Sequence, residues 1–240
     1  MKRLLIGITL IMLVLLSCET KEDKVKKETD LTAEQVQMPK DGDKIAIVKT
    51  NLGEVRLRLF ESIAPEAVNQ FVKNVEEGYY NGLELFSPPN KSTNAFINSN
   101  DLHVEKSLEI FETFIPNRHK DYHHYTGAVG FTSFTTSERE LVYFYKTFYI
   151  VAGDPMDQGT IDILDDLGFS EESIETYKAI GGMPWMDTDR DHPIFAQVYE
   201  GLNLLKDMIA LESKPMADGF GFVEPVFIDS ITIEVYEEGD

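Results

Sequence analysis

The chain contains one cysteine in 240 residues and far fewer basic than acidic side chains. A single cysteine excludes a disulfide framework and any zinc or iron–sulfur site built from cysteines. The 22 Lys and Arg residues against 42 Asp and Glu give a net charge of −20. This charge argues against a nucleic-acid partner, because phosphate binding needs a basic face. The remaining class is an acidic globular protein whose 42% hydrophobic residues suffice for one sizeable core.

Several common catalytic and metal-binding motifs are also missing. The sequence has no glycine-rich phosphate loop, no Gly-x-Ser-x-Gly nucleophile motif and no His-Glu-x-x-His. Asp187-x-Asp189-x-Asp191 begins like a calcium loop, but His192 and Val198 stand where an EF-hand has Gly and Glu. A solvated acidic turn is therefore the favoured interpretation.

A histidine cluster is the other candidate for metal binding. His119, His123 and His124 lie close together, and a spacing of four could place two imidazoles on one helix face. Neighbouring Arg118 and Lys120 would repel a cation, and no further ligand set is evident. We expect neither a metal nor a cofactor.

The N-terminus has the features of a bacterial lipoprotein signal. Two basic residues precede an apolar run of 13 residues, Leu4 to Leu16, which is shorter than the ~20 residues that cross a bilayer as a helix. The run ends in Ser17-Cys18 and resembles a lipobox. The resemblance implies a signal peptide over residues 1–17, acylation of Cys18, and an anchor in the bacterial cell envelope, at the outer membrane.

The segment after Cys18 is expected to be a flexible tether. Residues 18–43 are dense in Lys, Glu, Asp and Thr, and their few apolar residues bury too little surface to offset the entropy of ordering. We therefore place the folded domain at residues 44–240.

The folded part reads as mainly β. Residues 44–50 and 54–60 flank a turn ending in Gly53, and the second run alternates polar and apolar residues as a half-buried strand does. Pro65 opens a helix that Gly78 ends. Further strands are predicted at 127–131, 142–152, 194–198 and 226–235, a helix at 202–211, and an acidic helical insertion at 157–182. A β-barrel closed by helices suits this order better than a parallel sheet.

Four blocks in chain order resemble cyclophilin-type peptidyl-prolyl cis-trans isomerases. Residues 45–82 have the strand–Thr-Asn-x-Gly–strand–Pro–helix order of the family and end in Glu-Gly-Tyr-Tyr-Asn-Gly. Residues 148–151 resemble its Gln-Phe-Phe-Ile strand, residues 185–202 its Trp-Leu-Asp-Gly-Lys-His block, and residues 225–234 its closing strand. The resemblance covers residues 44–236 and implies a closed eight-stranded β-barrel capped by two α-helices.

The polar half of the family's site is largely replaced. In the family an Arg from Phe-His-Arg-Val donates a hydrogen bond to the prolyl nitrogen of the twisted bond, whereas Leu85 to Lys91 contains no Arg. Lys91 is the nearest cation and a candidate surrogate, with a less rigid donor geometry than Arg. Asn98 and Thr147 fall on two Gln residues of the family. More distant candidate cations are Arg118, Lys120 and Lys146.

The apolar half of the site is better retained. Phe96, Tyr149 and Met186 fall on the family's pocket Met, Phe and Leu, while Trp185 and His192 fall on its rim Trp and His. Simple core packing is the alternative interpretation for the first three. The predicted pocket consists of Phe96, Phe131, Thr132, Tyr149, Trp185, Met186 and His192.

The resemblance implies an isomerase-like lipoprotein, monomeric, that acts on proline-containing segments of envelope proteins with weak catalysis. One alternative is a non-catalytic module that binds peptides as a chaperone or scaffold. Another is that the acidic insertion at 157–182 docks an envelope partner while the old slot is unused.

Overall fold

The computed structural model describes residues 31–87, 96–100, 121–135, 141–153, 156–188, 194–216 and 219–239. The chain divides into residues 1–30 and a folded unit that begins at Leu31, and only the folded unit is described below. The predicted signal peptide and Cys18 lie outside the described residues, so acylation stays a prediction. Within the described parts of the chain, no helix has the length and apolar character needed to cross a membrane.

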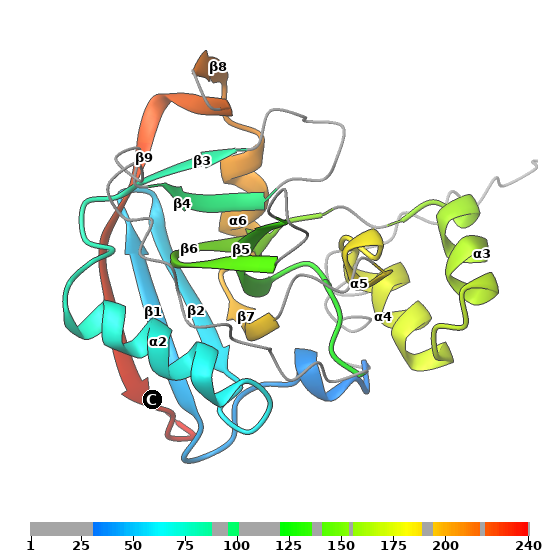
Figure 1. The fold of residues 1–240 in the computed structure, drawn as a ribbon. Helices are drawn as coiled ribbons and strands as arrows, with labels where there is room; N and C mark the ends of the chain where they lie inside the picture. Colours follow the sequence, from blue (N-terminus) through cyan, green and yellow to red (C-terminus); the bar gives the residue numbers. More distant parts are fainter. Residues whose placement is uncertain are drawn as a thin grey trace, which may run out of the picture. The chain divides into compact units, whose positions relative to one another are not determined.

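The fold is mainly β, as predicted: one antiparallel, strongly curled sheet with few helices (Figure 1). Its strands are β1 (Lys44–Thr50), β2 (Gly53–Leu59), β3 (Glu84–Ser87), β4 (Phe96–Asn100), β5 (Ala128–Thr135), β6 (Leu141–Val151), β7 (Ile194–Glu200), β8 (Ser213–Met216) and β9 (Gly219–Val235). The hydrogen-bonded order is β1-β2-β7-β5-β6-β4-β3-β9-β8. Strand β1 also pairs with β9, so the order leads from β1 through β9 back to β1.

The helices of the described residues fall into two groups. The helical elements are η1 (a 3₁₀ helix, Glu34–Val36), α2 (Pro65–Glu76), α3 (Gln158–Asp166), α4 (Glu171–Ile180), α5 (Trp185–Thr188) and α6 (Leu202–Ile209). Helices α2 and α6 pack on the sheet, whereas α3, α4 and α5 lie together to one side of it, beyond β5 and β6 (Figure 1).

The first hairpin follows directly from its sequence. The two-residue turn Asn51-Leu52 pairs Thr50 with Gly53 across β1 and β2. The Thr50 hydroxyl donates to the Gly53 carbonyl at 2.8 Å and accepts from the Leu52 amide at 3.2 Å, which fixes the turn. Gly53 has φ +148°, a value that L side chains rarely adopt.

The curled sheet encloses one large apolar core, called here the interior cluster. Helix α2 begins at Pro65, where a missing N–H costs nothing, and buries the ring of Phe71 in this core. The Phe71 ring lies 5.7 Å from that of Phe148 on β6 and 5.2 Å from that of Phe195 on β7, centroid to centroid. The core is therefore held by aromatic and aliphatic packing between α2 and facing strands.

The helical insertion predicted at residues 157–182 is present as α3 and α4. The side chain of Asp157 accepts from the Thr160 amide at the start of α3, and that of Ser170 accepts from the Ser173 amide at the start of α4. A second apolar cluster forms between these helices and the chain before β5. Its buried members are Ala33, Tyr125, Ile161, Leu164, Ile174, Tyr177 and Ile180.

The segment Leu31–Asp43 belongs to the folded domain, which corrects the expected boundary at residue 44. Gln35 on η1 is fully buried, and its side-chain amide donates to that of Gln197 on β7 at 2.9 Å. Arg58 on β2 donates to both the backbone carbonyl and the carboxylate of Glu34. Polar groups of this segment thus find partners on the sheet, which its charged composition does not reveal.

Candidate functional site

The register of the central strands brings several predicted site positions into one row. Asn98 on β4 pairs with Tyr149 on β6, and Tyr149 pairs on its other side with Gly130 on β5. Phe96 lies two residues along the same strand, opposite Val151. The side chains of Phe96 and Asn98 are outside the described part of the structure, so only their backbone positions are placed.

Tyr149 and Met186 come together on the outer face of the sheet. Along β6, Phe148 and Ile150 belong to the interior cluster, whereas Tyr149 and Val151 belong to a separate cluster with Met186 of α5. This alternation follows from the period of two in a strand. Tyr149 is 1% exposed and Met186 is 4% exposed. Both side chains are therefore packed within the protein rather than open to solvent.

Trp185, next to Met186 on α5, has a different environment. Its side chain is 44% exposed, whereas most other large apolar residues of the described chain are buried. Trp185 is thus the most accessible of the predicted pocket residues that the structure describes. This placement agrees with a position at the rim of a site.

Phe131 lies apart from Tyr149. It is fully buried in the interior cluster, with its ring 4.7 Å from that of Phe195. Because Phe131 pairs with Phe148 while Gly130 pairs with Tyr149, its side chain points to the opposite face of the sheet from Tyr149. Phe131 therefore supports the site from inside and does not line it.

Thr132 and Thr147 lie at an irregularity between β5 and β6. The register shifts there, so that Thr132 pairs with Phe144 directly after Phe131 pairs with Phe148. The Thr132 hydroxyl donates to the Thr147 carbonyl at 3.2 Å across this irregularity. Thr132 and Thr147 are therefore neighbours across the two strands, and the Thr132 hydroxyl is hydrogen-bonded to the backbone.

Lys146 is the one predicted candidate cation that falls on described residues, and Arg56 and Arg58, which were not candidates, are the arginines of those residues. The Lys146 ammonium lies 5.0 Å above the ring of Tyr79. Arg56 pairs with the carboxylate of Glu54 at 2.8 Å, and Arg58 pairs with the carboxylates of Glu34 and Asp43. The other positions predicted from sequence, Lys91, Arg118, Lys120 and His192, lie outside the described residues.

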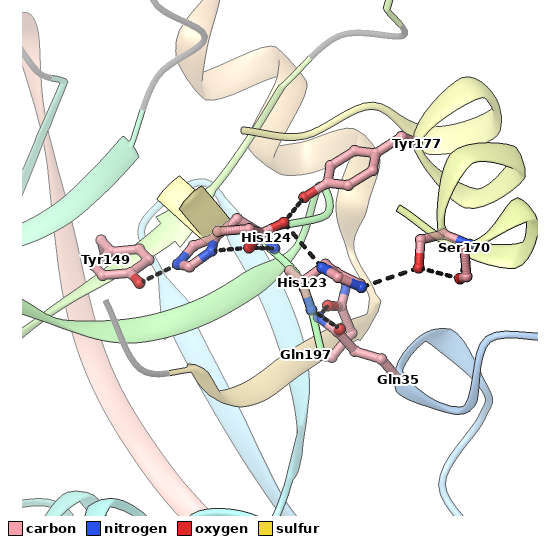
Figure 2. A network of polar contacts seen from close by, with 9 residues as sticks. Gln35, His123, His124, Tyr149, Ser170, Tyr177 and Gln197 are labelled. Atoms are coloured by element: carbon pink, nitrogen blue, oxygen red, sulfur yellow. Dashed lines mark hydrogen bonds and ion pairs between the residues drawn. The ribbon is translucent and has the colours of Figure 1, made fainter. Parts of the chain in front are cut away.

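The carboxylate of Asp187, 9% exposed, is linked to Tyr149 through His124. Its Oδ1 atom accepts from the backbone amide of His124 at 3.0 Å and faces His124 Nδ1 at 2.6 Å. Its Oδ2 atom faces His123 Nδ1 at 3.0 Å and accepts from the Tyr177 hydroxyl at 2.5 Å. The other ring nitrogen of His124 lies 2.8 Å from the Tyr149 hydroxyl. Figure 2 shows this chain of contacts, which leads from α4 to β6.

The same network extends to the N-terminal segment and to α4. The ring nitrogen Nε2 of His123 lies 3.0 Å from the Ser173 hydroxyl, and the side chain of Gln35 bonds both the amide and the carbonyl of His123. We call these connected residues the Asp187 network. Its members are Gln35, His123, His124, Tyr149, Ser170, Ser173, Tyr177, Asp187 and Gln197 (Figure 2).

The network sets the charge state of Asp187. Burial raises the pKa of this carboxyl group, but hydrogen bonds from His123 and His124 outweigh burial and lower the pKa to about 2 from an ordinary value of 3.8. Burial, together with the neighbouring Asp187 charge, raises the pKa of the Tyr177 hydroxyl well above its ordinary value. At neutral pH, Asp187 is therefore an anion and Tyr177 a hydrogen-bond donor.

Gly182 allows the helical insertion to approach this network closely. Its φ is +147°, and a Cβ atom there would lie 2.7 Å from a ring carbon of Tyr177 and 2.8 Å from the Cα of Tyr125. Gly182 also forms a β-bridge with Tyr125. A side chain at residue 182 would push the end of α4 away from the chain before β5.

The described histidines of the predicted cluster take part in hydrogen bonds of this network. The described residues contain no group of three or more His, Cys, Asp or Glu side chains that could hold a metal ion. His123 and His124, considered above for zinc, both engage Asp187 instead, and the first aspartate of the calcium-loop pattern is this same Asp187. The sequence pattern presents the two histidines only as metal candidates, and it places Asp187 in a solvated acidic turn within the block that resembles the family's Trp-Leu-Asp. The adjacent histidines and the Trp-Met-Asp block were the available signals.

Comparison with known proteins assigns the family. The profile of the cyclophilin type peptidyl-prolyl cis-trans isomerases matches residues 45–232. The chain belongs to this family. A Staphylococcus saprophyticus protein named as a peptidyl-prolyl cis-trans isomerase is 26% identical over 195 residues, covering 78% of this chain and 90% of that protein. A Staphylococcus epidermidis protein of the same name is 25% identical, with coverage of 81% and 93%.

Solved cyclophilin structures share the fold. A Cryptosporidium parvum cyclophilin type isomerase covers 81% of this chain and 99% of its own, with 14% identity and a TM-score of 0.52. The structure of the same protein in the presence of the dipeptide Ala-Pro gives 17% identity and a TM-score of 0.53, with coverage of 80% and 99%. At such identities the likeness concerns the fold alone. It supports the mainly β, curled sheet described above.

Proposed function

We propose that this cyclophilin-type protein binds proline-containing segments of envelope proteins at the outer face of β6 and isomerises their X–Pro bonds slowly. Family membership over residues 45–232 supports prolyl-isomerase-like function. The segment from Gly82 to Asp101, which holds the family's catalytic arginine, contains no Arg in this chain. This substitution is the observation that carries the proposal of slow turnover.

The chemistry explains why the arginine matters. Rotation about an X–Pro bond faces a barrier of ~18–20 kcal/mol, because the amide is conjugated. A fixed donor lowers that barrier by bonding the prolyl nitrogen, which becomes an acceptor only when the bond is twisted. Without such a donor, the site can still contact a prolyl ring through the exposed side chain of Trp185, with the buried Tyr149 packed beneath, but that binding is similar for planar and twisted bonds. Uniform binding of this kind does not raise the rate.

The test is an NMR exchange assay on a peptide containing Ala-Pro. The wild-type protein should broaden the exchange peaks weakly, and Tyr149→Ala should abolish the response. Lys91→Ala distinguishes a surrogate cation, because it should reduce exchange only if Lys91 supplies the missing donor. Tyr80→Phe is a matched control, since it removes one buried tyrosine hydroxyl from the interior cluster. Turnover equal to that of an arginine-containing cyclophilin would contradict the proposal.

A second function, peptide binding without isomerisation, is favoured by the exposure of Trp185. Tyr149 and Met186 are buried in one apolar cluster, whereas the aromatic side chain of Trp185 is accessible to a peptide. Titration of the same peptide separates the two functions. Chemical-shift changes at Trp185 without exchange between the cis and trans peaks would support the binding module and exclude the enzyme.

The location proposed for this activity rests on Cys18. Acylation of this residue would hold the domain at a bacterial membrane in the cell envelope, at the outer membrane, as a monomer. Mass spectrometry of the protein from membranes should show a diacyl or triacyl modification on Cys18 as the first residue. Cys18→Ser should release the protein from membranes, and an unmodified Met1 in the mature protein would contradict the assignment.

A further inference from the structure

We infer that Asp187 is a positioning residue for the prolyl slot: it fixes the tautomer of His124, and His124 in turn fixes the hydroxyl and ring of Tyr149. This inference rests on the proposed function only where it concerns peptide binding. It goes beyond that function because neither Asp187 nor His124 is among the predicted site residues, although Asp187 falls on the Asp of the family's Trp-Leu-Asp block.

The geometry for such positioning is present in one unbroken chain. The imidazole of His124 lies between the two other groups. Its Nδ1 atom is 2.6 Å from Asp187 Oδ1, and its Nε2 atom is 2.8 Å from the Tyr149 hydroxyl. The rings of His124 and Tyr149 are stacked, with centroids 6.0 Å apart and an interplanar angle of 23°. Both side chains are buried, so neither ring can turn without losing a partner.

The direction of each hydrogen bond follows from the charge on Asp187. A carboxylate has no proton to donate, so the proton between the two groups lies on His124 Nδ1. In the neutral imidazole, Nε2 then has only a lone pair, and the Tyr149 hydroxyl must donate to it. The backbone amide of His124 donates to the same carboxylate oxygen and holds the acid in place. The carboxylate thus determines which way the phenol proton points.

This arrangement explains how the chain accommodates a tyrosine, Tyr149, at the position where the family has a pocket phenylalanine. A buried phenol that lacks a partner costs free energy, which a phenylalanine would not. His124 supplies the partner, and Asp187 keeps His124 in the accepting tautomer. The ring is therefore anchored at its hydroxyl end as well as by packing.

The other oxygen of Asp187 ties the same carboxylate to the helical insertion. Tyr177 of α4 donates to Oδ2, and His123 faces it and reaches Ser173 of α4 through its other nitrogen. A displacement of α4 would therefore disturb the acid that holds His124. The insertion acts in this way as a support for the slot rather than as a separate module.

The decisive experiment reads the imidazole tautomer directly, by long-range ¹⁵N correlation spectra, which show on which ring nitrogen the proton lies. In the wild-type protein, His124 should carry its proton on Nδ1. The pattern should persist in Tyr149→Phe, because Asp187 sets it. In Asp187→Asn the amide can present either its oxygen or its nitrogen, so Nε2 should become partly protonated. A wild-type His124 protonated on Nε2 would overturn the inference.

A double-mutant cycle tests the consequence for binding. Asp187→Asn should weaken binding of the Ala-Pro peptide about fivefold in the native background, the size expected for one hydrogen bond. In the Tyr149→Phe background, the same substitution should change affinity less than about twofold. Equal losses in both backgrounds would show a general structural effect and overturn the inference. Tyr80→Phe should leave affinity unchanged.

The two proposals fail in different ways. If the wild-type protein shows no peptide response, the proposed function fails, while the tautomer of His124 still decides the role of Asp187. If Asp187→Asn does not fold, the tautomer in the wild-type protein and in Tyr149→Phe decides it. Loss of the Nδ1–H pattern in Tyr149→Phe would show that Tyr149, not Asp187, sets the imidazole, and would overturn the inference.

Discussion

The interior cluster is buried and the Asp187 network is mostly so, but they are held together by different forces. The interior cluster joins α2 to facing strands through aromatic rings such as Phe71, Phe148 and Phe195. Its notable polar contact is Asn74, whose amide bonds the Tyr80 hydroxyl at 2.9 Å and the Tyr145 carbonyl at 2.6 Å. The Asp187 network instead joins α4, α5 and the chain before β5 through a single anion.

The difference matters for function because the candidate slot lies at the second region. An apolar core tolerates exchange of one apolar side chain for another of similar volume, since dispersion is not directional. A hydrogen-bonded network allows few substitutions, because each member satisfies a particular donor or acceptor. Tyr149 lies between the two, with its strand in the curled sheet and its hydroxyl in the network.

The largest expected effect is in the interior cluster. Phe71→Ala removes a fully buried ring that lies against three others and should lower the free energy of unfolding by about 3–5 kcal/mol. Phe71→Leu keeps most of the volume and should cost less than about 1.5 kcal/mol. Urea denaturation measures both. Equal losses would mean that ring geometry, not volume, holds this core.

The matched experiment on the network should give the opposite pattern. Asp187→Leu replaces the acid by an apolar residue of the kind that fills the interior cluster. Here it leaves donors of His123, His124 and Tyr177 buried without an acceptor, so we expect a loss of about 3 kcal/mol. Urea denaturation beside Phe71→Leu makes the comparison direct. A loss below about 1 kcal/mol would show that the network contributes only packing.

The pH dependence of stability separates the regions further. The pKa of Asp187 is lowered to about 2 in the folded protein from 3.8, so its contribution is present above about pH 4 and is lost as pH falls toward 2. The coupling is on the order of 2 kcal/mol. Unfolding of the wild-type protein and Asp187→Asn should therefore differ more at pH 5 than at about pH 2. A difference that does not change with pH would contradict the lowered pKa.

The sequence predicted the regular parts of the fold well. The hairpin at residues 44–60, the helix opened by Pro65 and the helical insertion at 157–182 all follow from local periodicity, turn residues and caps. The boundary at residue 44 was wrong, because composition cannot show that Gln35 has a partner on β7, 162 residues away in the chain. Contacts of that kind depend on tertiary structure alone.

The candidate site was predicted in part. The family resemblance named Tyr149, Trp185 and Met186, and the structure brings Tyr149 and Met186 into one cluster. It did not show that Phe131 faces the interior, although Val129 and Phe131 alternate with Gly130 along β5. The role of Asp187 could not be read from sequence, because its partners, His123 and His124 before β5 and Tyr177 on α4, come from two separate segments. Its neighbours Asp189 and Asp191 made it look like one of a solvated run.

The smallest expected effect compares two buried tyrosine hydroxyls. In Tyr177→Phe a donor to a carboxylate is lost, which should cost about 2 kcal/mol, whereas Tyr80→Phe loses a bond from a neutral amide and should cost about 1 kcal/mol. Hydrogen exchange locates each loss. Tyr177→Phe should speed exchange in α4 more than in α2, because α4 depends on Asp187 for its attachment, and Tyr80→Phe should do the reverse. If hydrogen exchange became faster by the same factor in α2 and α4 in both variants, the two regions would unfold as one cooperative unit. The interior cluster and the Asp187 network would then differ in their interactions but not in their unfolding.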